Sequence, residues 1–312
     1  MSKDLLLGDE VMKEGTWNLE AIEDKAAKTS QWGLVGSRTY KGYPPSHVQL
    51  PAGAYSITLD RNDDTPIFIK KDIKTDHILP LENSLANNML KEIDIFWNKG
   101  DLFKKVGFLH RRGYMLYGPQ GTGKSGIVHL IVVDIIRRGG LVLLCENPKF
   151  FNRALAVIRQ VEPDRNLVCI FEDIDAIIEC YGEDELLSVL DGANMVDRCL
   201  NIATTNYPEK LDKRLVSRPR RFDRVIKIDQ PSEKLRREYF KMKLPKKENV
   251  ERWVKLTEGL SFAGMTEAII SVLCLGNRLE HSINVLKELE KNNPSSEEFG
   301  TRDNLGFGNE DL

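Results

Sequence analysis

An eight-residue segment near the middle of the chain constrains its fold more than any other feature. The segment consists of Gly118, Pro119, Gln120, Gly121, Thr122, Gly123, Lys124 and Ser125, and so has the spacing Gly-x-x-x-x-Gly-Lys-Ser. It follows an apolar run at 114–117 and precedes apolar residues at helical spacing in 127–133, which is the context of a phosphate-binding loop. Backbone N–H groups of such a loop and the positive end of the helix dipole attract phosphate oxygens. The segment therefore predicts nucleotide binding, with Lys124 on the β- and γ-phosphates and the Ser125 hydroxyl on Mg²⁺.

Apolar runs recur along the middle of the chain and are separated by helical patterns. The runs span 114–117, 141–145, 167–171, 200–204 and 225–228. They are continuously apolar rather than alternating, which is typical of parallel strands that are buried on both faces. Residues 232–290 show helical patterns only. We therefore expect an α/β fold: a P-loop NTPase doubly wound parallel sheet, followed by a small helical lid domain and preceded by a small β-rich N-terminal segment.

Changes in composition and periodicity divide the chain into five expected segments. These are a polar N-terminal segment at 1–37 with one short helix at 19–28, a small β-rich module at 38–80, the α/β domain at 81–230, the lid at 231–290, and a disordered tail at 291–312. Within the second segment, the alternation over 55–59, the polar turn at 61–64 and the apolar run at 66–69 predict a β-hairpin. The hairpin is either a module of its own or an edge packed on the main domain, and the pattern leaves both interpretations open.

Two carboxylates follow the apolar run at 167–171, and a third lies close behind. Glu172 and Asp173 come directly after the run, and Asp175 follows. The carboxyl ends of parallel strands face the crevice where ligands bind, so one acid there can hold Mg²⁺ and a neighbour can polarise an attacking water. Glu172 and Asp173 are therefore candidate catalytic residues, and Glu172 with Ser125 are the candidate metal ligands. The sequence leaves open which acid holds the metal and which the water. Capping of the following helix would explain Asp175 but not the whole cluster.

Composition excludes several classes of protein. The 45 Lys and Arg against 47 Asp and Glu give a net charge of −2, which argues against coating of nucleic acid by the whole chain. No apolar run approaches the ~18 residues of a membrane span, and the N-terminus lacks the pattern of a signal peptide. The five cysteines form no Cys-x-x-Cys pair and the five histidines are scattered, so no zinc site is expected. We expect a cytoplasmic protein with reduced cysteines and no membrane association.

Four further segments occur along the chain in the order found in one protein family. Residues 112–119 are similar to its approach to the phosphate loop, 186–192 to its second-half helix, 203–206 to its sensor 1, and 211–223 to its arginine-finger segment. The stretch from about 93 to 262 thus resembles the AAA+ ATPases, specifically the classical AAA clade. Within that clade, the ATPase module is most similar to the mitochondrial translocase group that handles the Rieske iron–sulfur protein.

The resemblance implies an ATPase that uses ATP and Mg²⁺ to remodel, disassemble or translocate a protein partner. It implies a homo-oligomeric ring, with six subunits as the family default and seven as the translocase-like alternative. Asn206 would sense the γ-phosphate, while Arg218 and Arg221 would reach the ATP of the neighbouring subunit as permanently charged guanidinium groups. Two features depart from the family pattern. Glu172 and Asp173 replace the usual order Asp-Glu, and Arg220 takes a position usually held by Gly.

The resemblance also raises the question of a pore-lining aromatic residue. In the family, such a residue comes from the connection after the second strand, which is short here and spans 146–152. Phe150 and Phe151 are the candidates. Their helical spacing with Leu155 and Ile158 favours core packing over exposure in a pore.

Two other functions remain as alternatives. Basic clusters at 104–105, 111–112 and 214–224 suggest a nucleic-acid-associated AAA+ motor or loader. No aromatic residues are interleaved with them as a stacking platform, which weakens this alternative. A nucleotide-gated scaffold without turnover is the third hypothesis.

Overall fold

The computed structural model describes part of the chain and divides it into two compact units. The described residues are 12–13, 16–17, 31–36, 38–43, 49–73, 85–191, 196–212, 215 and 221–291. The units are Met1–Leu50 and Pro51–Leu312. In the first unit, β1 (Met12–Lys13) pairs antiparallel with β2 (Thr16–Trp17), and β3 (Gln31–Gly36) pairs antiparallel with β4 (Thr39–Tyr43). The helix predicted at 19–28 and the tail predicted beyond Lys291 lie outside the described residues.

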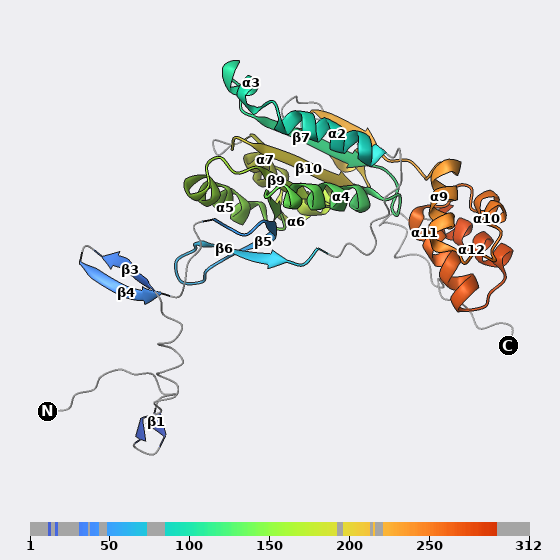
Figure 1. Ribbon diagram of the computed structural model, residues 1–312, viewed down its shortest axis with the longest axis horizontal. Helices are drawn as coiled ribbons and strands as arrows, with labels where there is room; N and C mark the ends of the chain where they lie inside the picture. Colours follow the sequence, from blue (N-terminus) through green and yellow to red (C-terminus); the bar gives the residue numbers. More distant parts are fainter. Residues whose placement is uncertain are drawn as a thin grey trace. The chain divides into compact units, whose positions relative to one another are not determined.

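A seven-stranded sheet forms the centre of the second unit (Figure 1). Its strands are β5 (Gly53–Leu59), β6 (Pro66–Lys71), β7 (Arg111–Tyr117), β8 (Leu141–Leu144), β9 (Leu167–Phe171), β10 (Cys199–Thr205) and β11 (Arg224–Lys227). They lie in the order β11-β7-β10-β9-β8-β5-β6, and all neighbours pair parallel except β5 and β6. Every residue of β9 and β10 is buried, as the continuously apolar runs require for strands covered on both faces. The predicted α/β fold is confirmed.

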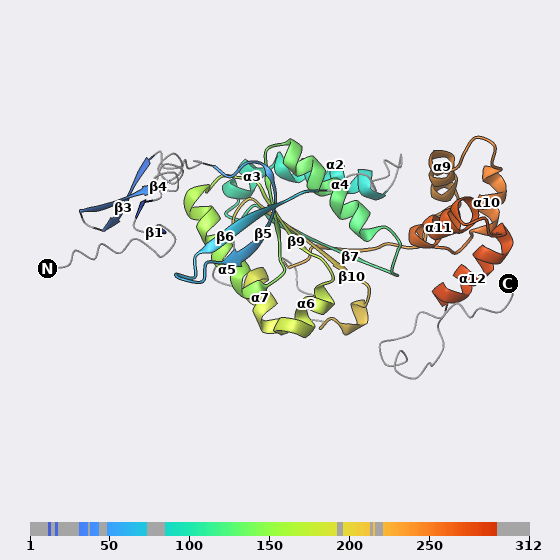
Figure 2. The ribbon, with the colours of Figure 1, turned by 90° about the horizontal axis from the view of Figure 1, so that it is seen from below.

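Helices cover both faces of this sheet. The helices are α2 (Leu85–Trp97), α3 (Gly100–Lys105), α4 (Lys124–Arg137), α5 (Pro148–Val161), α6 (Ile174–Tyr181), α7 (Glu183–Asp191) and a 3₁₀ turn at Pro208–Lys210. Figure 2 shows α2 and α4 on one face and α5, α6 and α7 on the other. Since parallel strands need crossover connections, this alternation of strand and helix accounts for the two layers of helices.

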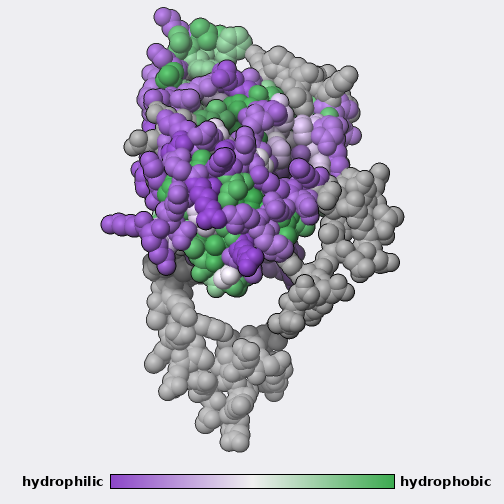
Figure 3. Space-filling view, turned by 90° about the vertical axis from the view of Figure 1, so that its right-hand side faces the viewer, coloured by the Kyte–Doolittle hydropathy of each residue, from purple (hydrophilic) through white to green (hydrophobic). Residues whose placement is uncertain are grey.

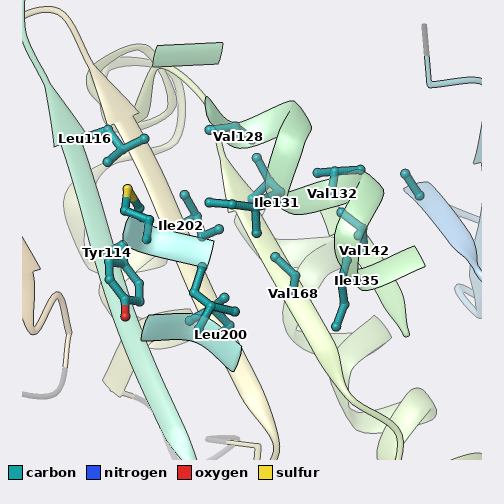
Figure 4. Packing of buried hydrophobic residues seen from close by; sticks show 14 of the residues in the cluster. Tyr114, Leu116, Val128, Ile131, Val132, Ile135, Val142, Val168, Leu200 and Ile202 are labelled. Carbon is teal, nitrogen blue, oxygen red and sulfur yellow. The ribbon is translucent and has the colours of Figure 1, made fainter. Parts of the chain in front are cut away.

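The core under α4 explains how the phosphate loop is held in place. The helix buries Val128, Ile131, Val132 and Ile135, whose spacing puts them on one stripe. Figure 4 shows this stripe against strand residues of the same cluster, which include Tyr114, Leu116, Val142, Val168, Leu200 and Ile202. Full burial of each such side chain contributes about 1.5–3 kcal/mol. The start of α4 is thereby fixed against the carboxyl ends of the strands.

The predicted hairpin at 55–69 is present and belongs to the central sheet. β5 pairs parallel with β8 and antiparallel with β6. Residues 53–57 of β5 are buried, while β6 alternates half-buried and exposed residues over most of its length, as expected for an edge strand with one face in solvent. Of the two interpretations left open by the sequence, the edge on the main domain therefore matches the structure. The compact unit that contains the hairpin begins at Pro51, inside the segment predicted as a separate module at 38–80.

The segment after β11 consists of helices, as the pattern over 232–290 predicts. They are α9 (Glu233–Lys243), α10 (Val250–Leu256), α11 (Phe262–Ile269), a π-helical turn at Ile270–Cys274, and α12 (Leu279–Lys291). Side chains of Ser232, Asn249 and Ser261 accept hydrogen bonds from backbone N–H groups at the starts of α9, α10 and α11, which stabilises each helix end. A second core, centred on Phe240, Trp253 and Met265, joins these helices.

One face of the molecule and the lengths of its helices bear on membrane association. Figure 3 shows one face of the molecule, on which hydrophilic residues predominate and apolar residues appear in small groups. Among the helices of the described residues, none combines the length and the apolar composition that crossing a membrane requires.

Candidate active site

The phosphate loop connects β7 to α4 and depends on its glycines. Gly118 has φ of +150°, and a Cβ atom there would lie 2.1 Å from the Ile228 carbonyl oxygen. Gly123 precedes the first residue of α4 in the left-handed conformation, with φ of +100°. Only glycine adopts these conformations without strain and leaves the space that the neighbouring backbone occupies. Gly118 and Gly123 therefore stand at positions of the loop that only glycine can occupy without strain.

Lys124 is the first residue of α4 and is only 6% exposed. Its Nζ donates hydrogen bonds to the carbonyl oxygens of Gly118 and Pro119, both at 2.8 Å. Burial lowers the pKa of Lys124, and the carboxylates of Asp173 and Asp175 act in the opposite direction. The ammonium group therefore lies over the carbonyl groups of its own loop, where a phosphate oxygen would be a stronger, charged partner.

Asp173 and Asn206 come from neighbouring strand ends and contact each other. Because Phe171 of β9 pairs with Ala203 of β10, the residues that follow these two strands meet at one edge of the sheet. The Asp173 N–H donates to Thr204 Oγ1 at 3.0 Å, and Asn206 Nδ2 donates to Asp173 Oδ1 at 3.3 Å. Asp173 also has a left-handed backbone, with φ of 46°, an uncommon conformation outside glycine and often found at functional sites.

Asp175 does not cap the helix. The N-cap of α6 is Asp173, and Asp175 lies in the first turn. Its Oδ1 accepts a hydrogen bond from Thr205 Oγ1 at 2.7 Å, and Thr205 Oγ1 in turn accepts one from the Tyr207 N–H at 3.0 Å. The capping interpretation of Asp175 is thus wrong, because its carboxylate instead holds the end of β10 against α6.

One cavity of about 290 Å³ brings the phosphate loop and these residues together. It is lined by Gln120, Gly121, Gly123, Lys124, Ser125, Gly126, Asp173, Thr204 and Asn206. Glu172 is not among them and lines a different cavity. The structure thus places Asp173, rather than the expected metal ligand Glu172, at the phosphate loop. Thr204 was missed as a site residue, although it lies in the segment that resembles sensor 1.

The oxygen donors of this cavity fit Mg²⁺ bound together with a nucleotide. The Ser125 hydroxyl is a hard oxygen ligand of the kind that Mg²⁺ prefers, and the ion usually takes its remaining ligands from phosphates and water. No group of three or more His, Cys, Asp or Glu side chains in the described part of the chain would hold a metal ion without a nucleotide.

Two arginines are expected to reach the ATP of the neighbouring subunit, and the structure describes one of them. Arg218 lies outside the described residues. Arg221 is 4% exposed, and its Nε donates to Asp191 Oδ2 at the end of α7 in the same chain. The Arg221 carbonyl also packs closely on Gly113 of β7. The structure thus brings Arg221 to α7 of its own subunit. Of the described candidates for catalysis, Glu172 and Arg221 do not line the cavity, and of the phosphate-loop candidates, Gly118, Pro119 and Thr122 do not.

Replacing Arg221 by alanine is expected to lower the free energy of unfolding by about 1–3 kcal/mol, because it removes a buried guanidinium stem and its charged hydrogen bond to the solvent-exposed Asp191 carboxylate. Chemical denaturation checks this value, and a double-mutant cycle with Asp191→Ala isolates the pair. Arg224→Ala is the matched control: Arg224 is exposed, pairs with Glu92 at 3.4 Å, and should contribute about 0–1 kcal/mol. Unchanged stability of Arg221→Ala together with lost turnover would contradict the structural role.

Phe150 and Phe151 stand at the start of α5, which follows β8 after three residues. Phe151 is 1% exposed and packs on Phe171, with 5.7 Å between ring centroids. Phe150 is half-buried. The expected core packing is confirmed for Phe151, because its position on α5 turns it toward β9.

Comparisons with known proteins agree with this fold and site. Residues 114–230 match the family model described as "ATPase family associated with various cellular activities (AAA)". The proteasome-activating nucleotidase of Saccharolobus islandicus (strain M.14.25 / Kamchatka #1) is 29% identical over 220 residues, which is 63% of this chain and 56% of that protein. The nucleotidase of Saccharolobus solfataricus is 30% identical over 201 residues (57% and 51%), and that of Methanocaldococcus jannaschii is 29% identical over 215 residues (61% and 47%).

The matched region spans about half the length of these curated relatives. Together, the AAA match, the nucleotidase relatives and the seven-stranded sheet support an AAA+ ATPase. They do not single out the Rieske-translocase group that the ATPase module resembles in sequence.

Proposed function

We propose that this protein binds Mg²⁺-ATP in the cavity at the phosphate loop and hydrolyses it within a homo-oligomeric ring, in order to remodel, disassemble or translocate a protein partner. The observation that carries the proposal is the composition of that cavity. Lys124, Ser125, Asp173 and Asn206, which come from α4 and from the ends of β9 and β10, line the same 290 Å³.

Each of these residues has a role that its position supports. The loop N–H groups and Lys124 would bind the phosphates, and Ser125 would hold Mg²⁺, which neutralises charge on the phosphates. Asp173 would orient the attacking water and accept its proton, because Asn206 holds its carboxylate at the cavity. Glu172 lines the other cavity, so we assign the metal to Ser125 rather than to Glu172.

The protein partner and the ring rest on the relatives and on the family pattern. Proteins named proteasome-activating nucleotidases are among the similar proteins, which favours a protein rather than a nucleic acid as substrate. Two of the arginines behind the nucleic-acid alternative, Arg112 and Arg224, both pair with Glu92, at 3.1 and 3.4 Å. Their charge is partly neutralised within the chain. We assign the role in the neighbouring subunit to Arg218, because Arg221 is paired with Asp191.

Mixing two inactive variants tests hydrolysis and the ring together. Lys124→Ala and Arg218→Ala should each be inactive alone, whereas a 1:1 mixture should regain turnover. About one quarter of the interfaces in a randomly mixed ring join an intact phosphate loop to an intact Arg218. Phosphate release is measured over a range of ratios, and light scattering verifies assembly.

The chain that carries both substitutions is the control, since mixing cannot restore it. Assembled mixtures without turnover at any ratio would contradict the role of Arg218 across the interface. Assembled wild-type protein that neither binds Mg²⁺-ATP nor releases phosphate would contradict the proposed function itself.

A further inference from the structure

A second cavity, of about 360 Å³, lies beside the first and shares Asp173 with it. Its floor is formed by the ends of β8 and β9, through Leu144, Cys145 and Ile170, and its wall by the face of α6 that carries Ala176, Ile177, Cys180 and Tyr181. Most of these side chains are apolar. Burial and the adjacent Glu146 carboxylate raise the pKa of the Cys145 thiol, so this part of the floor stays uncharged at neutral pH.

Two further carboxylates stand at the rim of this cavity. Glu146 and Glu172 both line it, and both are exposed. Within the described part of the chain, neither carboxylate has a Lys, Arg or His within ion-pair distance. Like charges around a concave apolar wall produce a negative potential that a cation relieves. No metal-binding group of three or more such side chains occurs among these residues, so a metal ion is not the ligand.

We propose that this cavity binds a basic side chain and an adjacent apolar side chain of the protein substrate. The inference rests on the proposed function, in which the partner is a protein, and specifies the chemistry of the segment that is recognised. The class of ligand follows from the lining: the aliphatic stem of an arginine or lysine packs on apolar residues while its charged end reaches a carboxylate.

The size of the cavity supports a short peptide segment over a larger ligand. A volume of 360 Å³ lies at the lower end of the roughly 300–1,000 Å³ typical of ligand pockets. This space accommodates one or two side chains. Tyr181 is 37% exposed at the end of α6 and adds an aromatic surface on which a guanidinium can stack.

Asp173 links this cavity to the phosphate loop. Its carboxylate accepts a hydrogen bond from Asn206 and acts on the charge of Lys124, while the same residue lines the peptide cavity. A cation bound beside Asp173 attracts the same carboxylate that is proposed to orient the attacking water. Peptide binding is therefore expected to change the rate of ATP hydrolysis.

Fluorescence anisotropy with full-length protein tests the proposal. The probe is a fluorescein-labelled ten-residue peptide in which arginine alternates with leucine, compared with peptides in which glutamate replaces arginine or serine replaces leucine. We expect each replacement to weaken binding at least tenfold, or about 1.4 kcal/mol. Glu146→Lys, which reverses a rim charge, and Cys180→Trp, which fills the cavity from an exposed position, should each weaken binding of the arginine peptide at least tenfold.

Glu179→Lys is the matched control. Glu179 is exposed and lies on α6, but at 100° per residue it points away from the face that lines the cavity, so binding should stay within twofold. Basal ATP hydrolysis of Cys180→Trp and Glu179→Lys should equal that of the wild type.

Several outcomes would overturn the proposal. The first is that both Glu146→Lys and Cys180→Trp bind the arginine peptide as tightly as the wild type does. The second is that Glu179→Lys weakens peptide binding as much as they do. The third is that spermidine displaces the peptide and that replacing leucine by serine does not change the affinity. Wild-type ATP hydrolysis is measured in the same samples. Hydrolysis without peptide binding contradicts only the cavity assignment, whereas absence of hydrolysis contradicts the proposed function.

Discussion

Replacing Lys124 by alanine is expected to weaken Mg²⁺-ATP binding by at least about 100-fold, or about 2.7 kcal/mol. The Lys124 ammonium is buried at the start of α4 and is the one cation of the cavity lining. It is held by the carbonyl groups of Gly118 and Pro119, within a loop whose N–H groups attract phosphate. Loss of a desolvated, charged hydrogen bond to phosphate has a large effect on binding. Isothermal titration calorimetry measures the change.

The stability of the Lys124→Ala variant separates lost binding from unfolding. Burial lowers the pKa of Lys124 below 10.5 in the folded protein, so between these two values the unfolded chain binds more protons. The contribution of this residue to stability therefore rises with pH in that window. The alanine variant should lack this rise and should be no less stable than wild type at neutral pH. Lys149→Ala, at a lysine whose side chain is 59% exposed, is the control and should bind nucleotide normally. Normal binding by Lys124→Ala would contradict the assignment of the loop.

Replacing Asp173 by asparagine is expected to slow ATP hydrolysis by about 10²–10⁴-fold while leaving ATP binding intact. The amide has the same shape, retains the backbone hydrogen bond to Thr204, and still accepts a hydrogen bond from Asn206 through Oδ1. It cannot take a proton from the attacking water. ATP should therefore remain bound. Single-turnover phosphate release measures the slowed hydrolysis, and an assay of retained nucleotide measures the bound ATP.

The matched variant Glu172→Gln decides which acid acts in hydrolysis. Because Glu172 lines the neighbouring cavity, its substitution should slow hydrolysis less than Asp173→Asn does. If Glu172→Gln slows hydrolysis more than Asp173→Asn does, Glu172 is the residue that orients the attacking water. Full activity of Asp173→Asn would remove Asp173 from the catalytic residues.

The predictions from sequence succeeded where the signal is local. The spacing of Gly118, Gly123 and Lys124 specifies a loop because backbone conformation at each position depends on adjacent residues. The continuously apolar runs at 167–171 and 200–204 specify buried strands because each strand is covered on both faces. The helical period over 232–290 predicted the helices α9 to α12, because this period also involves residues that are close together in the sequence.

Long-range pairing, by contrast, was decided only in the tertiary structure. Whether β5 and β6 join the sheet depends on pairing between Gly53 and Leu141, which are far apart in the chain. Arg221 meets Asp191, which lies thirty positions earlier in the chain, and nothing near either residue in the sequence indicates the other.

The order of the two acids shows the same division most clearly. The sequence by itself determined that Glu172 and Asp173 follow a buried strand. Strand alternation does not continue through them, because β9 ends at Phe171 and Asp173 has a left-handed backbone at the start of α6. Which of them faces the phosphate loop depends on the face that α4 covers and on the register of β9 with β10. Only the packed structure supplies both, and it selects Asp173.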